Sequence, residues 1–150
     1  MPTVTRLAAM VLFGAVAYHL TELYFDALGY KSEASVYIMV VFAALVGWRL
    51  VGPKIDRSIL RAFAIVFKGM GSTLFFAFSF SGIMAIFTNP AHKRYTSLEQ
   101  AFSLLASDFW GHMGRFFVTD FGLKLLEGGV FVTLMLVVVF RVAEARRWAR

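Results

Sequence analysis

Residues 69–91 read GMGSTLFFAFSFSGIMAIFTNPA and contain no formally charged side chain. A helix that crosses the roughly 30 Å hydrocarbon core of a bilayer needs about 20 mainly apolar residues, because each residue adds about 1.5 Å. The apolar residues here form a continuous run, whereas lipid-facing strands of a barrel alternate apolar and polar residues over about 10 positions. The stretch therefore predicts a helix that crosses a membrane.

The composition of the whole chain also indicates a protein that lies in a lipid bilayer. Hydrophobic residues make up 59% of the chain and charged residues 16%, and the mean hydropathy is +0.72. A soluble domain carries about 25% charged residues. We therefore expect an integral membrane protein.

Three further apolar stretches approach the length of a membrane span. Together with the first they predict spans at about 7–26, 34–52, 67–88 and 116–140. No linker rich in Pro, Gly or Ser and no internal repeat divides the chain. The predicted fold is an all-α membrane protein, in which a four-transmembrane-helix bundle forms one integral membrane domain over residues 1–150.

The segment between the third and fourth spans predicts an amphipathic helix. In residues 95–111, Leu98, Phe102, Leu105 and Phe109 recur near helical spacing, while acidic and amide side chains fall elsewhere. Such a helix lies in the plane of the membrane interface.

The basic residues predict the orientation of the chain. One side of the predicted bundle would hold Arg6, Arg49, Lys54, Arg57, Arg61, Arg141, Arg146, Arg147 and Arg150. The other side would hold Lys31, Lys93, Arg94 and Arg115. By the positive-inside rule, both termini are cytoplasmic. The net charge of +6 then reflects topology, and we expect no nucleic-acid partner, because the charges flank helices instead of forming one basic and aromatic face.

The first span has a second interpretation. Arg6, the apolar run after it and Ala15-Val16-Ala17 resemble a signal peptide with a small-residue cleavage site. Cleavage would leave an odd number of spans. We therefore expect an uncleaved first helix.

The sequence offers little chemistry for catalysis or metal binding. It contains no cysteine, so it has no disulfide and no thiol chemistry of its own. His19, His92 and His112 are scattered and form no known metal motif. We predict no catalytic residue, no metal site and no cofactor, and hence a protein that is not an enzyme.

Two sets of residues predict contacts of the helices. Helices associate in lipid through small residues that allow their backbones to approach closely. On the third span such residues recur at i, i+4 spacing and form a helix-packing stripe of Thr73, Ala77, Ser81 and Ala85. A tryptophan or a basic residue near a helix end anchors the helix at the lipid headgroups. We predict that Trp48, Arg49 and Trp148 are such interfacial anchors. Arg49 could instead belong to an anion-entry site, formed with Lys54, Arg57 and Arg61.

One polar cluster is a candidate site within the membrane. Asp120, Lys124 and Glu127 lie at i, i+4 and i+7 on one helix face, and Glu22 reaches the same level on the first span and could pair with Lys124. A charged group at the middle of a span costs about 2.5 to 3.5 kcal/mol, so such groups usually face the bundle interior with a partner. Either these four residues line a small polar cavity that binds an ion or relays protons, or they form a structural ion-pair network.

Short motifs along the whole chain carry a family resemblance. They are Met1-Pro2-Thr3, Arg6-Leu7-Ala8-Ala9, Thr21-Glu22, Val46-Gly47-Trp48-Arg49, Val51-Gly52, Arg94-Tyr95, Glu99, Ala101, Gly128-Gly129, Glu144, Arg146, Arg147, Trp148 and Arg150. With them the chain resembles the TrgA family of bacterial membrane proteins associated with tellurite resistance. It departs from the family in the first outer loop, Asp26-Ala27-Leu28-Gly29-Tyr30, where members show a Pro-rich Pro-Glu segment.

The resemblance implies a non-enzymatic, multi-pass protein of the bacterial inner membrane with a role in tellurite resistance. Cellular tellurite chemistry runs largely through thiols, so a chain without cysteine cannot supply the reductant. Two alternatives stay open. The chain could be an accessory subunit of a larger bioenergetic or photosynthetic complex, which suits its 17 phenylalanines, or a small dimeric transporter, which would require a central buried acid. The expected partners are the lipid bilayer and either a second copy or a larger membrane complex.

Overall fold

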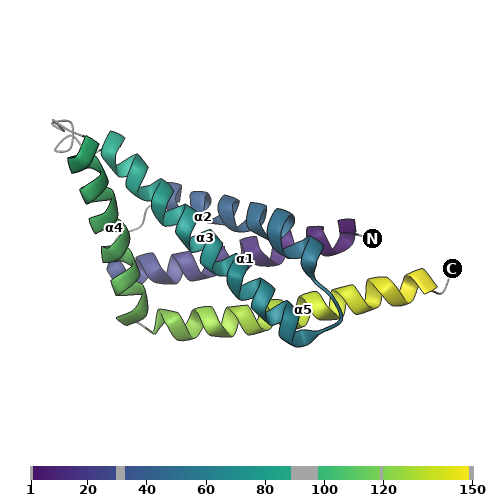
Figure 1. Ribbon diagram of the computed structural model, residues 1–150. Helices are drawn as coiled ribbons and strands as arrows, with labels where there is room; N and C mark the ends of the chain where they lie inside the picture. The colour runs from purple at the N-terminus through teal and green to yellow at the C-terminus, as the bar shows by residue number, and fades with distance from the viewer. Residues whose placement is uncertain (1, 30–32, 89–97, 119, 149–150) are drawn as a thin grey trace.

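The computed structural model describes residues 2–29, 33–88, 98–118 and 120–148 (Figure 1). This part of the chain is helical, with short turns and no strand. Its elements are α1 (Pro2–Leu28), α2 (Glu33–Val46), the π-helix η1 (Gly47–Val51), the 3-10 helix η2 (Gly52–Lys54), α3 (Ile59–Thr88), α4 (Leu98–Val118) and α5 (Phe121–Trp148). The prediction of an all-α fold is confirmed for these residues.

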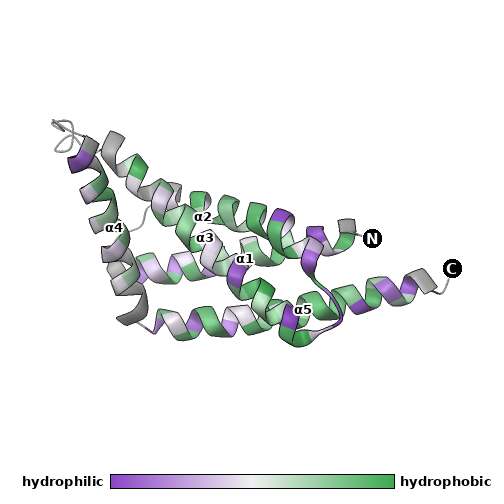
Figure 2. Cartoon of the chain, viewed as in Figure 1, coloured by the Kyte–Doolittle hydropathy of each residue, from purple (hydrophilic) through white to green (hydrophobic). Residues whose placement is uncertain are grey.

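Four helical stretches are long and apolar enough to cross a membrane, as predicted. They are Val4–Asp26, Ser35–Lys54, Ile59–Met84 and Phe121–Arg146. Figure 2 shows apolar residues along these helices, and polar residues on the connection between α2 and α3 and near the end of α5. This distribution is compatible with helices that cross a bilayer and keep their charged residues near its surfaces.

The third helix begins earlier than the predicted span of 67–88. It starts at Ile59, where the carbonyl of Ser58 accepts a hydrogen bond from the amide of Ala62 at 3.0 Å. The predicted span began next to Lys68, but that side chain is exposed and does not interrupt the helix.

The fourth helix begins later than predicted, because residues 116–118 end α4. The chain turns before Phe121, and the carbonyl of Asp120 accepts a hydrogen bond from the amide of Lys124 at 3.1 Å. Asp120 therefore precedes α5 instead of lying within it. An acidic side chain is favourable there, because the helix dipole is positive at its N-terminus.

The main buried cluster joins all four long helices. α1 contacts α2 and α5, and α3 contacts both α2 and α5. The cluster consists of Ala9, Phe13, Ala43, Val46, Val51, Ile55, Ala62, Val66, Met70, Val132, Leu136 and Val137. The first turn of α1 and the last turns of α5 lie at the same end of this assembly (Figure 1).

Pro53 explains why α2 ends in a π-helix and a 3-10 turn. Proline has no amide proton to donate to the carbonyl four residues earlier and its ring clashes with that carbonyl, so a regular α-helix cannot continue. The backbone widens instead, and the amide of Gly52 donates to the carbonyl of Gly47, five residues back.

Two glycines of η1 and η2, Gly47 and Gly52, lie directly against the backbone of α1. A Cβ atom at position 47 would lie 2.5 Å from the carbonyl oxygen of Ala9. A Cβ at position 52 would lie 2.6 Å from the Cα of Arg6. Only glycine allows helices to approach this closely, so these two positions set the distance between α1 and the end of the second span.

The connection between η2 and α3 is tied to α5. Arg57 Nε donates to Glu144 Oε2 at 2.6 Å, and Arg141 Nη2 donates to the carbonyl oxygen of Arg57 at 3.3 Å. The hydrogen bond and the negative charge of Glu144 raise the pKa of the Arg57 guanidinium above its ordinary value. Because the Arg57 side chain is exposed, this ion pair orients the connection and adds little stability.

α4 crosses the end of the assembly that lies away from both termini (Figure 1). It was predicted as an amphipathic helix over residues 95–111 and extends from Leu98 to Val118. The side chains turned toward the core are Leu105, Phe109 and Met113, at successive i+4 positions. Phe102, which the predicted apolar stripe included, is 71% exposed.

Candidate functional site

The structure divides the predicted polar cluster between two helices. Glu22 Oε1 accepts a hydrogen bond from the Tyr18 hydroxyl at 3.0 Å, within α1. Lys124 Nζ lies 3.2 Å from Glu127 Oε2, within α5, and these side chains are 53% and 69% exposed. Asp120 is exposed ahead of α5.

The proposed pairing of Glu22 with Lys124 is not formed, because each of them contacts a neighbour on its own helix. Pairs at i, i+3 and i, i+4 form with little ordering of the chain. None of Glu22, Asp120, Lys124 and Glu127 lines the internal cavity described below. The described contacts are local pairs, Tyr18 with Glu22 within α1 and Lys124 with Glu127 within α5.

The small-residue stripe of α3 is buried where its side chains are described. Thr73 and Ala77 are 5% and 4% exposed, and the Thr73 hydroxyl donates to the carbonyl of Gly69 at 3.0 Å. The side chains of Ser81 and Ala85 lie outside the described part of the structure. Both Thr73 and Ala77 border the cavity.

The predicted interfacial anchors lie at the end of the assembly that carries the first turn of α1. Trp48 is half-buried and Arg49 is exposed, and both belong to η1. The side chain of Trp148 lies outside the described residues. Arg49 and Lys54 are both exposed there, as headgroup contacts require.

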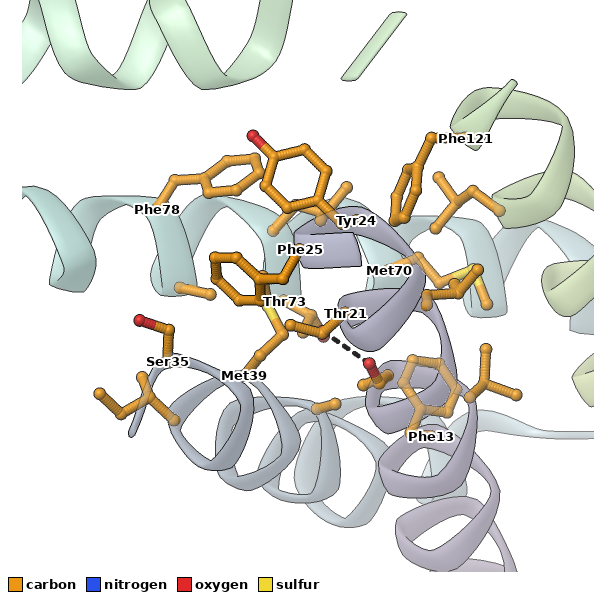
Figure 3. Close-up of a pocket in the computed structure, with 18 of the residues that line it drawn as sticks. Phe13, Thr21, Tyr24, Phe25, Ser35, Met39, Met70, Thr73, Phe78 and Phe121 are labelled. Atoms are coloured by element: carbon orange, nitrogen blue, oxygen red, sulfur yellow. Dashed lines mark hydrogen bonds between the residues drawn. The ribbon is translucent and has the colours of Figure 1, made fainter. Parts of the chain in front are cut away.

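A cavity of about 250 Å³ lies among α1, α2, α3 and the first turns of α5. Figure 3 shows side chains from these helices around a common space. Its lining residues are Phe13, Val16, Ala17, Leu20, Thr21, Tyr24, Phe25, Ser35, Ile38, Met39, Ala43, Met70, Thr73, Leu74, Ala77, Phe78, Met84, Phe121 and Leu125.

The walls of the cavity are almost entirely apolar, and no charged side chain lines it. The two threonines in the wall use their hydroxyl protons within their own helices. Thr21 donates to the carbonyl of Ala17 at 2.6 Å (Figure 3). Thr73 donates to the carbonyl of Gly69 at 3.0 Å. The other hydroxyls in the wall belong to Tyr24 and Ser35.

Two buried clusters contribute residues to the cavity wall. Phe13, Ala43 and Met70 belong both to the lining and to the main buried cluster. Tyr24, Phe25 and Phe78 belong both to the lining and to a second buried cluster. Its rings meet edge to face, with centroids 5.7 Å apart for Tyr24 and Phe25 and 5.6 Å apart for Tyr24 and Phe121.

The sequence analysis missed this cavity. The sequence feature that could have indicated the cavity is a set of small residues on three different helices. Ala17, Ala43 and Ala77 all line the space. On one helix, small residues predict close packing. Here they leave a gap, because large side chains on the neighbouring helices prevent the backbones from closing.

The described residues show no group of three His, Asp or Glu side chains placed to hold a metal ion. Comparison with protein-family models, curated proteins and solved structures finds no match for this chain. The function must therefore be argued from the residues and their geometry.

Proposed function

We propose that this chain is a small non-enzymatic integral membrane protein of TrgA type that lowers tellurite toxicity. In this proposal the four long helices form a transmembrane bundle in the bacterial inner membrane, with both termini in the cytoplasm. The excess of basic residues at one end supports this orientation, because Arg49, Lys54 and Arg57 are all exposed there.

The observation that carries the proposal is the position of the glycine motifs on which the resemblance rests. Gly47 and Gly52 lie against the backbone of α1. A Cβ atom at position 128 would lie 2.9 Å from Val16, and one at position 129 would lie 2.5 Å from the ring of Phe67. The motifs therefore coincide with close contacts between helices in this chain, and this supports the proposal that the resemblance reflects a common mode of helix packing.

The protein acts on tellurite resistance indirectly. It has no cysteine with which to reduce tellurite. Its cavity presents no charged side chain to an oxyanion, and burial of an unpaired charge in an apolar space is strongly unfavourable. The protein therefore supports resistance through the membrane or a membrane partner.

Deletion of the gene and growth on potassium tellurite test this role. We expect the deletion strain to tolerate less tellurite, and wild-type protein or Gly71→Ala to restore growth, because Gly71 is exposed and a Cβ there meets nothing within 4 Å. Gly47→Ala should fail to restore it, because helix packing is disturbed. Unchanged tolerance after deletion would contradict the proposal.

A second function, as accessory subunit of a larger membrane complex, is favoured by a continuous aromatic surface. Phe75 and Phe76 on α3 are 56% and 47% exposed, and Trp110 on α4 is 69% exposed. Phe109 links the two helices, with its ring centroid 5.9 Å from Phe75 and 5.8 Å from Trp110. Such a surface suits lipid, pigment or protein.

Purification in a mild detergent, followed by native mass spectrometry, distinguishes these functions. Co-purification with a large complex would support the accessory subunit. A discrete dimer would instead support the small transporter.

A further inference from the structure

The apolar cavity has the size of a small hydrophobic ligand. An engineered apolar cavity of about 150 Å³ in another protein stays free of water and binds benzene. By that proportion, the 250 Å³ found here offers room for about ten carbon atoms. That number of carbon atoms makes up a large part of one lipid alkyl chain.

Water is a poor occupant of this space. An ordered water needs two to four polar partners, and the protons of Thr21 and Thr73 are already donated to backbone carbonyls of α1 and α3. No carboxylate, amide or cationic group lines the walls. Apart from the threonines, the only side-chain hydroxyls in the wall are those of Tyr24 and Ser35. The cavity therefore favours a mainly apolar occupant.

The surroundings supply such an occupant. The lining residues belong to the four stretches that are long and apolar enough to cross a membrane, and lipid chains are the medium around such helices. Met84 lines the cavity and is also 41% exposed, so the space communicates with the surroundings beside this residue. We propose that the cavity binds an alkyl chain that enters from the bilayer.

The walls suit a flexible chain of variable shape. Met39, Met70 and Met84 all line the space, and methionine adapts to irregular apolar ligands because its unbranched side chain rotates easily. The aromatic side chains of Tyr24, Phe25 and Phe78 add flat apolar surface to the same wall. This inference does not depend on the proposed role in tellurite resistance.

Photo-crosslinking in vesicles tests the proposal. The protein is reconstituted into phosphatidylcholine that carries a diazirine on one acyl chain, and labelled residues are identified by mass spectrometry after irradiation. We expect labelling of Met70, which is only 6% exposed and lines the cavity, as well as of lipid-facing Leu60, which is 83% exposed. A second set of vesicles carries the diazirine on a free fatty acid, which distinguishes the two sources of the chain.

Ala77→Leu should fill the cavity and reduce labelling of Met70 by about tenfold or more, since even one misplaced methylene in an apolar pocket weakens binding by about tenfold. Labelling of Leu60 should not change. Ala64→Leu is the matched control, because Ala64 is exposed on the same helix and its replacement should leave both signals intact.

The proposal is overturned if Met70 is unlabelled in the wild-type protein by both probes, or if Ala77→Leu leaves its labelling unchanged. Ala17→Leu fills the same space from α1 and provides an independent variant if Ala77→Leu does not fold. It should reduce labelling of Met70 in the same way.

Discussion

Gly47→Ala should destabilise the protein by about 3 kcal/mol, at the upper end of the usual cost of overpacking. The new Cβ would lie 2.5 Å from the carbonyl oxygen of Ala9 and 2.8 Å from its carbonyl carbon. These are backbone atoms, so no side-chain rotation relieves the contact, and α1 must move away from η1. Unfolding of the purified protein in mixed micelles, followed by tryptophan fluorescence, measures the change.

Gly71→Ala is the matched control. Gly71 is also a helical glycine, but it is exposed and a Cβ there meets nothing within 4 Å. Alanine favours the helix by about 1 kcal/mol relative to glycine, so this variant should be as stable as the wild type or more stable. Equal stability of Gly47→Ala and Gly71→Ala would show that α1 and η1 are not packed backbone to backbone.

Maleimide labelling of single cysteines introduced at opposite ends of the helices should be all or none. The natural chain contains no cysteine, so it provides a blank without signal. Lys54 and Glu99 are both exposed, in η2 and α4 respectively. A membrane-impermeant maleimide added to intact spheroplasts should label Glu99→Cys and leave Lys54→Cys unlabelled.

In the proposed topology, the hydrocarbon core of the membrane separates the two sites. α3 joins η2 to α4 by way of the stretch Ile59–Met84, which is long and apolar enough to cross a bilayer. A charged reagent does not cross the hydrocarbon core. Lys54→Cys should become reactive only after permeabilisation. Labelling of Lys54→Cys alone in intact spheroplasts would reverse the proposed orientation, and equal labelling of both variants would contradict a span between them.

The positions of the helices could be predicted from the sequence, but some of their boundaries could not. Apolar runs of about the length that a bilayer core requires identified the four stretches. The start of α5 was placed too early, because Phe116, Phe117 and Val118 are apolar enough to extend the run, although they end α4. Hydropathy does not reveal a change of direction between two apolar helices.

The candidate site was harder to predict. Spacing correctly placed Lys124 and Glu127 on one face, and they form an ion pair. Their relation to Glu22 depended on the rotation of α1 against α5, for which the sequence has no periodic signal. Each residue instead found a partner within its own helix.

The sequence by itself determined that the described chain has four helical stretches long and apolar enough to cross a membrane, because the free energy of moving a side chain into hydrocarbon is a property of that residue and adds along the chain. Only the tertiary structure decided that Gly47 and Gly52 set the approach of α1 and that Ala17, Ala43 and Ala77 leave a cavity between them. Packing depends on the shapes of side chains from several helices together, and no single segment contains that information.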